Sequence, residues 1–241
     1  LDLQDDKQVS VWYMDDYAAE LDQAGHLEAY RNATWDKENA KVFTFPGPAE
    51  WHPDAWVGRK AVEVIRSHSA GTPLFHWVSF SGPHYPFDPP SEYLNRVDVT
   101  TLGIGNRCEG DLDDTGKIHH GSFTGTPPAL IDGLGAAGGA CRNYSDDYWL
   151  KLRHHYHANI AQIDDEVGRI LDAARERFGD NLLIVFTSDH GEMMGNHGLW
   201  GKQCCGYDDV MRIPFIAHMP GKFEGGTCDR VVSQVDLMPT F

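Results

Sequence analysis

The stretch NLLIVFTSDHGE occupies residues 181–192 and decides which fold this sequence can adopt. Its first part, residues 181–187, is a nearly continuous apolar run, which is typical of a strand buried between two layers of helices. Gly179 and Asp180 come just before the run and end the preceding segment. The run therefore predicts a strand. The polar residues 188–192 then lie at its carboxyl end, where open α/β sheets bind their ligands.

A long amphipathic helix is predicted directly upstream of this strand. Between residues 146 and 178, apolar side chains recur every three or four positions, as expected of a helix with one buried face. Residues 54–68 show a similar spacing and predict a second packed helix. A third helix is expected over residues 15–31, with Asp15 as its N-cap residue. The histidines of the long helix are interpreted as solvated side chains; they are His154, His155 and His157.

Further strands are expected on either side of these elements. Residues 73–80 are rich in aromatic and β-branched side chains and end at a Ser-Gly-Pro turn, which predicts a buried strand. Another strand is predicted at residues 213–218. The side chains of Trp77, Phe80, Phe186 and Trp200 are interpreted as packing in the interior. The order of helices and strands favours an α/β sheet covered by helices.

Residues 99–142 are interrupted by glycine throughout, so they predict an irregular insertion rather than a second domain. The chain begins with Leu1, and its last residues read as the first turn of a helix with Asp236 as a possible N-cap. We therefore expect the natural sequence to continue at both ends.

The composition excludes several classes of protein. There are 36 acidic and 20 basic residues, and the formal net charge of −16 disfavours nucleic acid and anionic membranes as partners. The apolar share of 41% and the charged share of 23% are those of an ordinary globular domain. No apolar run approaches the roughly 18 residues that a membrane span needs. The 5 cysteines are odd in number and form no C-x-x-C pair, so a complete disulfide framework is not expected.

The residues after the 181–187 strand have the chemistry of a metal site. Asp189 and His190 offer an oxygen and a nitrogen ligand to a divalent cation, and Gly191 permits the irregular turn that both need to reach one ion. The tripeptide alone is more often a helix cap beside a surface histidine. The glycine-rich loop that follows adds His197 and Lys202, whose ammonium group can contact an anion.

His84 follows the predicted strand at 73–80. If that strand and the 181–187 strand are parallel neighbours, His84 lies at the same edge of the sheet as Asp189.

Three motifs, in this order, resemble the sulfatase family of the alkaline-phosphatase superfamily. They are SGPHYPF at 81–87, TSDHGEMMGNHGLWGK at 187–202 and YDDVMRIPFI at 207–216. The likeness is closest to the branch of choline sulfatases, iduronate-type sulfatases and phosphonate monoester hydrolases. The resemblance implies an alkaline-phosphatase-like α/β fold, a mixed, mostly parallel sheet covered by helices on both faces. It makes residues 1–241 the carboxyl-side part of a single catalytic domain, with 99–142 as an insertion.

The resemblance also implies a role for each candidate residue. Asp189 and His190 match two metal ligands of the family, whose metal is commonly Ca²⁺; a histidine ligand leaves Mn²⁺ or Zn²⁺ as alternatives. Lys202 matches the lysine that contacts the sulfate or phosphate group. His84 matches the histidine that faces the ester oxygen near the leaving group, and His197 matches a substrate-side position that is often histidine in this branch.

The nucleophile of the family is missing from this sequence. It lies in C-x-P-S-R, with the cysteine converted to formylglycine, or in S-x-P-S-R, and neither motif is present. The paired aspartates of the family's first strand are also missing. The stretch GKIHH at 116–120 resembles the family's G-K-W-H but follows His84 instead of preceding it, so we interpret it as a coincidence. The nucleophile is expected upstream, and the isolated chain is expected to be nearly inert.

These residues predict metal-dependent hydrolysis of a small-molecule sulfate ester. A phosphonate monoester or phosphodiester hydrolase of the same superfamily remains an alternative, because these motifs do not separate S–O from P–O chemistry. A non-catalytic, anion-binding relative is the third interpretation. The organic part of the substrate, the cellular compartment and the oligomeric state are left open.

Overall fold

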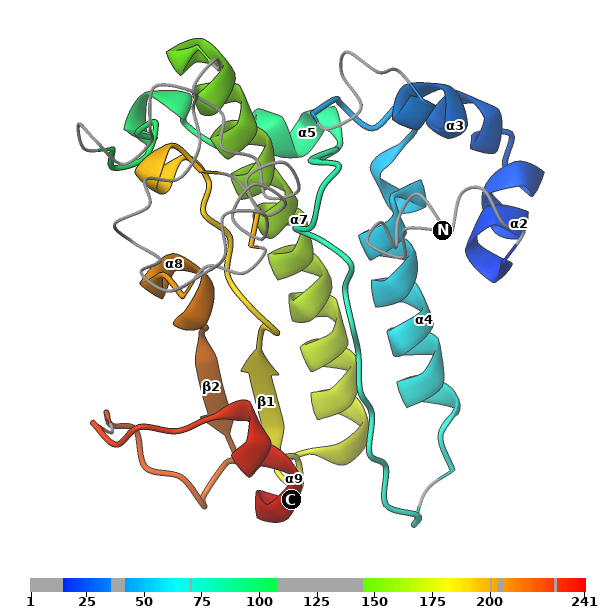
Figure 1. Ribbon diagram of the computed structural model, residues 1–241. Coiled ribbons are helices and arrows are strands. Elements are labelled where there is room, and N and C mark those ends of the chain that lie inside the picture. The colour runs from blue at the N-terminus through cyan, green and yellow to red at the C-terminus, as the bar shows by residue number, and fades with distance from the viewer. Residues whose placement is uncertain are drawn as a thin grey trace, which may run out of the picture.

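The computed structural model describes residues 15–35, 42–69, 71–107, 145–199, 201–202, 206–227 and 229–241. In chain order its elements are α2 (Asp16–Gln23), α3 (Leu27–Trp35), η1 (Ala49–Trp51), α4 (Pro53–Ser67), α5 (Ser91–Leu94), η2 (Val99–Thr101), α7 (Asp146–Phe178), β1 (Ile184–Thr187), η4 (Asn196–Gly198), α8 (Asp208–Met211), β2 (Phe215–His218), η5 (Gln234–Asp236) and α9 (Leu237–Thr240). Figure 1 shows α4 and α7 as two long helices, with the β1–β2 pair on the other side of α7 from α4.

Helix α7 has the bounds that the sequence predicts. Its N-cap is Ser145, whose side-chain oxygen accepts a hydrogen bond from the Tyr148 N–H at 3.2 Å. The helix ends at Gly179, where φ is 58°, a left-handed value that glycine adopts without strain. His155 lies on the buried face of this helix and is only 7% exposed, so the interpretation of all three of its histidines as solvated was wrong for His155.

Helix α4 packs along α7 and confirms the helix predicted at 54–68. It starts at Pro53, a position where the missing backbone N–H costs no helical hydrogen bond. The two helices come so close that a Cβ added at Gly58 would lie 2.2 Å from Oε2 of Glu166. Toward the other end of α4, Ile65 packs against the alanines of α7.

The predicted strand at 181–187 is shorter in the structure and forms β1, which pairs antiparallel with β2. In this register Ile184 lies opposite His218 and Thr187 lies opposite Phe215. Phe186 is 41% exposed, so its predicted packing in the interior was wrong. The β1 strand places the residues from Ser188 onward at its carboxyl end.

The strand predicted at 73–80 is an extended segment instead. It runs beside α7 in Figure 1, and within the described residues it forms no backbone–backbone hydrogen bond. Its side chains alternate between half-buried and exposed positions, and both Phe75 and Trp77 are 69% exposed. The alternation has the period of a strand, but a strand needs a neighbour to complete its ladder. The prediction that Trp77 packs in the interior was therefore wrong.

The helix predicted at 15–31 is two helices, α2 and α3, because the chain turns at Gly25, where φ is 78°. Asp15 caps the first of them as predicted, since its Oδ1 accepts a hydrogen bond from the Ala18 N–H at 2.7 Å. At the other end of the chain the helical turn α9 has Asp236 at its N-cap position, as predicted, although the Asp236 side chain makes no capping hydrogen bond to α9. That side chain instead shares a capping box with Ser233 at the start of η5.

Much of the predicted insertion at 99–142 lies outside the described residues, and so do all the cysteines, Trp200 and the GKIHH stretch. Residues 99–107 form η2 and an extended segment. Among the helices that the structure describes, none has both the length and the apolar character needed to cross a membrane.

Candidate active site

The loop after β1 brings Asp189 and His190 together at an exposed position. Nε2 of His190 lies 3.4 Å from Oδ2 of Asp189, and the Asp189 side chain is 82% exposed. The backbone is fixed locally, because the Ser188 hydroxyl donates to the His190 carbonyl at 2.7 Å and the His190 N–H donates to Oδ1 of Asp189 at 2.8 Å. One carboxylate oxygen and one imidazole nitrogen therefore face the same space.

The hydrogen bonds of His190 determine which of its nitrogens could bind a metal. Nδ1 lies 2.8 Å from the carbonyl oxygen of Gly191, which can only accept, so Nδ1 carries the proton. Nε2 then keeps its lone pair, as a metal ligand requires. Within the described residues no group of three or more histidine, cysteine or acidic side chains could hold a metal ion. Asp189 and His190 fit two ligands of a divalent cation, and this role stays a prediction.

Gly191 allows this loop to lie against the segment that contains α8. Its N–H donates to the carbonyl of Val210 at 2.8 Å, and a Cβ added at Gly191 would lie 1.8 Å from the carbonyl oxygen of Asp209. No side chain fits at this position unless one of the two backbones moves. The loop after β1 and the segment around α8 are thus packed as one unit.

The carboxylate of Glu192 organises the loop that leads to Lys202. The backbone N–H groups of Met193, at 3.1 Å, and of Gly201 both donate to its Oε1. Burial raises the pKa of the Glu192 carboxyl, while the Gly201 amide and the Lys202 ammonium act in the opposite direction. Because Gly201 immediately precedes Lys202, this interaction fixes the backbone from which the lysine extends.

Lys202 and His84 meet at the ring of Tyr85. Nζ of Lys202 is 5.7 Å from the centroid of this ring, and the imidazole of His84 stacks on it at 4.5 Å with an interplanar angle of 25°. Nδ1 of His84 lies 2.7 Å from the Tyr85 carbonyl and must donate to it, so Nε2 is the nitrogen that faces away from this bond. The two residues that sequence reasoning placed on the ester group therefore contact the same ring. Tyr85 was not predicted, although it stands next to His84 in the motif.

His197 makes a separate aromatic contact. Its ring stacks on Tyr207 at 4.3 Å with an interplanar angle of 21°, and its backbone N–H donates to the carbonyl of Asn106 at 2.7 Å. His197 thus joins the loop after β1 to the segment before α8. Its proposed contact with substrate stays a prediction.

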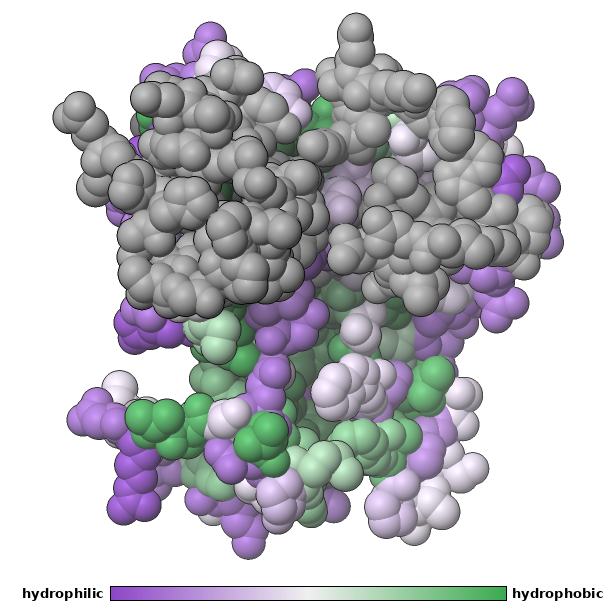
Figure 2. All heavy atoms as spheres, viewed as in Figure 1, coloured by the Kyte–Doolittle hydropathy of each residue, from purple (hydrophilic) through white to green (hydrophobic). Residues whose placement is uncertain are grey.

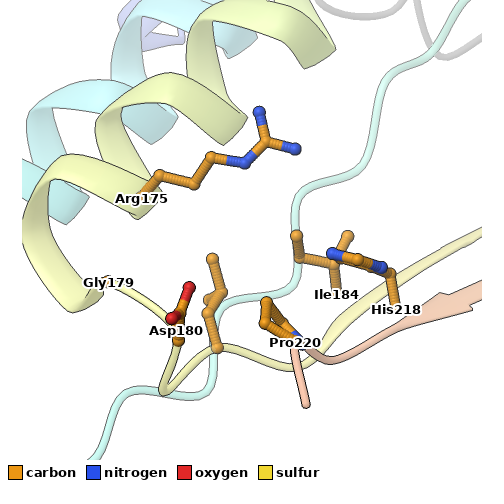
Figure 3. A pocket seen from close by; sticks show the side chains of 7 residues that line it. Arg175, Gly179, Asp180, Ile184, His218 and Pro220 are labelled. Atoms are coloured by element: carbon orange, nitrogen blue, oxygen red, sulfur yellow. The ribbon is translucent and has the colours of Figure 1, made fainter. Parts of the chain in front are cut away.

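A pocket of about 200 Å³ lies at the other end of β1 (Figure 3). It is lined by Arg175, Gly179, Asp180, Leu182, Ile184, His218 and Pro220. Ile184 is the first residue of β1, whereas Asp189 follows the last, so this pocket does not contain the predicted site.

Comparison with solved structures identifies the fold. The chain superimposes on the phosphonate monoester hydrolase of Agrobacterium radiobacter with a TM-score of 0.67 at 24% sequence identity, covering 86% of this chain and 42% of that one. The fold is thus alkaline-phosphatase-like α/β, which confirms the predicted fold class. The β1–β2 pair is the part of the sheet that the described residues contain.

Comparison of sequences identifies the family. The Sulfatase family model matches residues 3–241, and the chain belongs to the sulfatase family. It is 29% identical over 238 residues to the uncharacterized sulfatase YidJ of Escherichia coli (strain K12), covering 98% of this chain and 40% of that protein. It is 28% identical over 195 residues to the arylsulfatase of Clostridium perfringens, covering 78% and 37% of the two chains. The chain therefore spans about two fifths of the length of these relatives.

Proposed function

We propose that this chain forms one side of the active site of a hydrolase that cleaves small-molecule sulfate esters. The observation that carries the proposal is the meeting of His84 and Lys202 at the Tyr85 ring in a member of the sulfatase family. Two groups that can be cationic are thereby held against one aromatic ring. Such a pair suits an ester group that gains negative charge as its bond to the leaving group breaks.

Asp189 and His190 would hold a divalent cation, which we propose is Ca²⁺, with Mn²⁺ or Zn²⁺ as alternatives. Their facing oxygen and nitrogen atoms, 3.4 Å apart, support this assignment. A bound cation would supply charge stabilisation to the ester oxygens. The remaining ligands and a formylglycine nucleophile in C-x-P-S-R, or a serine in S-x-P-S-R, would come from residues outside 1–241.

Lys202 and His84 would act differently on the substrate. The Lys202 ammonium would offset the charge of the sulfuryl oxygens, with its backbone fixed by the bond from Gly201 to Glu192. His84 holds one proton on Nδ1 in its bond to the Tyr85 carbonyl, so it would need a second proton, on Nε2, to protonate the leaving oxygen. His197 would contribute to binding from the side of Tyr207.

The test is a paired assay of the full-length protein that contains this chain. An aryl sulfate and the matching aryl phosphonate monoester are compared at saturating Ca²⁺, and again after chelation and restoration of the metal. We expect a higher kcat/KM for the sulfate, loss of activity with chelator and recovery with metal. A preference for the phosphonate would replace the proposal with P–O hydrolysis. Binding of sulfate without turnover of either ester would identify a non-catalytic relative.

A further inference from the structure

The loop at residues 82–88, which carries His84 and Tyr85, is held at both ends by one buried polar network. At its start, the Gly82 N–H donates to Oδ1 of Asp54 at 2.9 Å. The Asp54 side chain is completely buried, and a Cβ added at Gly82 would lie 2.2 Å from its Oδ2. Only glycine allows the backbone to approach this carboxylate so closely.

At the end of the loop, Asp88 is held by two other segments of the chain. Its Oδ2 accepts a hydrogen bond from the Tyr30 hydroxyl of α3 at 2.7 Å, and its Oδ1 lies 3.4 Å from Nε2 of His52. Asp88, His52 and Tyr30 are all buried. Burial and the Asp88 carboxylate raise the pKa of Tyr30 well above its ordinary value, so the phenol keeps its proton and remains a donor.

The imidazole of His52 joins the two ends of the network. Its Nδ1 accepts a hydrogen bond from the Asp54 N–H at 3.2 Å, so the ring's proton is on Nε2 and points to Asp88. The same ring is the N-cap of α4. At the start of α4, the carboxylate of Asp54 therefore holds Gly82 and the imidazole of His52 holds Asp88. The hydrogen bond from the Asp54 N–H to His52 couples the orientations of these two side chains.

Burying these groups costs free energy, which their hydrogen bonds must offset. Both carboxylates are completely buried and have partners at the two ends of the loop, while His84 lies between them. From this geometry we propose that Asp54 is a positioning residue, which fixes the start of the His84 loop for catalysis. The inference rests on the proposed role of His84 in the hydrolysis of the ester.

Asp54 is the better residue to change. The end of the loop is also held by backbone hydrogen bonds from Phe43 to Phe87, at 3.2 Å, and from Phe45 to Pro89, at 3.1 Å. These bonds would keep that end in place without Asp88. At Gly82 the carboxylate of Asp54 is the partner of the backbone N–H, so its removal should release the start of the loop.

The experiment measures kcat of the full-length enzyme for aryl sulfates whose leaving groups range from activated to poor. Asp54→Ala should lower kcat for the poorest leaving group by roughly 10²-fold, the effect expected when a reacting group is misplaced by about 1 Å, and much less for activated esters. His84→Ala should show the same dependence. Asp54→Asn keeps an oxygen acceptor for Gly82 and should restore most of the rate. The double variant Asp54→Ala/His84→Ala should be no slower than His84→Ala alone.

A second measurement does not depend on activity. Hydrogen exchange in the peptide that spans Gly82 should be faster in Asp54→Ala and close to wild type in Asp54→Asn. Asp98→Ala is the matched control, because the Asp98 carboxylate also accepts a backbone hydrogen bond, from Thr100 at 3.0 Å, but at an exposed turn. It should change neither the exchange of Gly82 nor the rates.

The results separate the failure of this inference from the failure of the proposed function. Equal loss of kcat across all the esters, additive losses in the double variant, or unchanged exchange at Gly82 would overturn the positioning role. If the wild-type enzyme hydrolyses none of the esters, the proposed function is wrong. The exchange measurement then still decides whether Asp54 holds the loop.

Discussion

At Lys202 the ammonium group and the Tyr85 ring are 5.7 Å apart, a distance at which a cation and an aromatic face attract each other. If this ammonium stabilises the sulfuryl oxygens, Lys202→Ala should lower kcat/KM of the full-length enzyme roughly 10²-fold or more for every ester, as the loss of an oxyanion donor does. Steady-state kinetics would measure it. The exposed Lys222 provides the control, because Lys222→Ala should keep wild-type rates. Wild-type rates in Lys202→Ala would contradict the assignment.

Asp189 allows a test of metal binding that leaves the fold intact. Its side chain is 82% exposed, so Asp189→Ala removes a charge without making a cavity. With the metal removed from both proteins by chelation, we expect the variant to unfold at the wild-type denaturant concentration. With metal supplied, we expect it to lack bound metal and activity. Elemental analysis of the purified protein measures the metal. Asp180→Ala, an exposed carboxylate at the opposite end of β1, should retain both. Normal metal content in Asp189→Ala would exclude Asp189 as a ligand.

The candidate residues of the site differ in how far the sequence predicts them. Asp189 and His190 are adjacent in a motif, so their proximity follows from the chain itself. The contact of Lys202 with Tyr85 and the bond from Gly82 to Asp54 each join residues that are distant in sequence. Residue spacing carries no signal for such contacts. The glycine-rich loop singled out Lys202 and the motif resemblance gave it a role, but nothing in the sequence singled out Tyr85 or Asp54.

At the scale of elements, His155 of α7 gives the fold a dependence on pH. Burial lowers its pKa from 6.5 to about 4. Above pH 6.5 the ring is neutral in both the folded and the unfolded state and contributes no pH dependence. As the pH falls toward 4, the unfolded state binds a proton that the folded state does not, so stability is lost. The full difference corresponds to about 3 kcal/mol at most.

His155→Gln tests this effect. Glutamine can still donate to the Lys151 carbonyl, which His155 contacts at 2.9 Å, but it does not titrate. Urea unfolding at a series of pH values between 7 and 4 should show a smaller loss of stability in the variant than in the wild type. His154→Gln serves as the comparison on the same helix, at a side chain that is not fully buried. Parallel curves for His155→Gln and wild type would refute the expected pH dependence.

Elements whose determinants are local were predicted well. Helix α7 carries its own start at Ser145, its own end at Gly179 and a periodic apolar face between them, and its 33 residues have the predicted bounds. Residues 73–80 carry only the alternation of a strand. Such a segment joins a sheet only if another strand lies beside it, and its own residues do not show whether that strand exists. His155 is a similar case, because its burial depends on what packs against α7.

For the whole molecule, the most informative surface is apolar. The large exposed hydrophobic side chains include Phe75, Trp77, Phe186, Phe215, Ile216, Val235, Met238 and Phe241. Figure 2 shows one face of the molecule, with apolar residues gathered in its lower half. The ring centroids of Phe75 and Phe241 lie 6.3 Å apart. Single proteins rarely expose so many neighbouring apolar side chains. The chain also spans about two fifths of the length of its relatives, so we expect this face to be covered in the whole protein.

This expectation can be measured by hydrogen exchange of the full-length protein. If residues outside 1–241 pair with the extended segment at 73–80, its amides should exchange as slowly as those of β1. The exposed residues 224–227, outside any helix or strand, are the fast-exchanging reference in the same sample. Exchange at 73–80 as fast as at 224–227 would mean that the segment has no strand partner.

The close approach at Gly191 has a consequence for anyone who wishes to transplant this site into another scaffold. Gly191 lies against the backbone of Asp209 and Val210, and no substitution at those two positions would remove these backbone atoms. A graft of residues 187–202 alone would therefore lack the backbone of residues 209 and 210, against which the turn at Gly191 packs. The smallest portable unit includes residues 207–212 as well, and homologous recombination between sulfatases should tolerate crossovers outside these two segments better than between them.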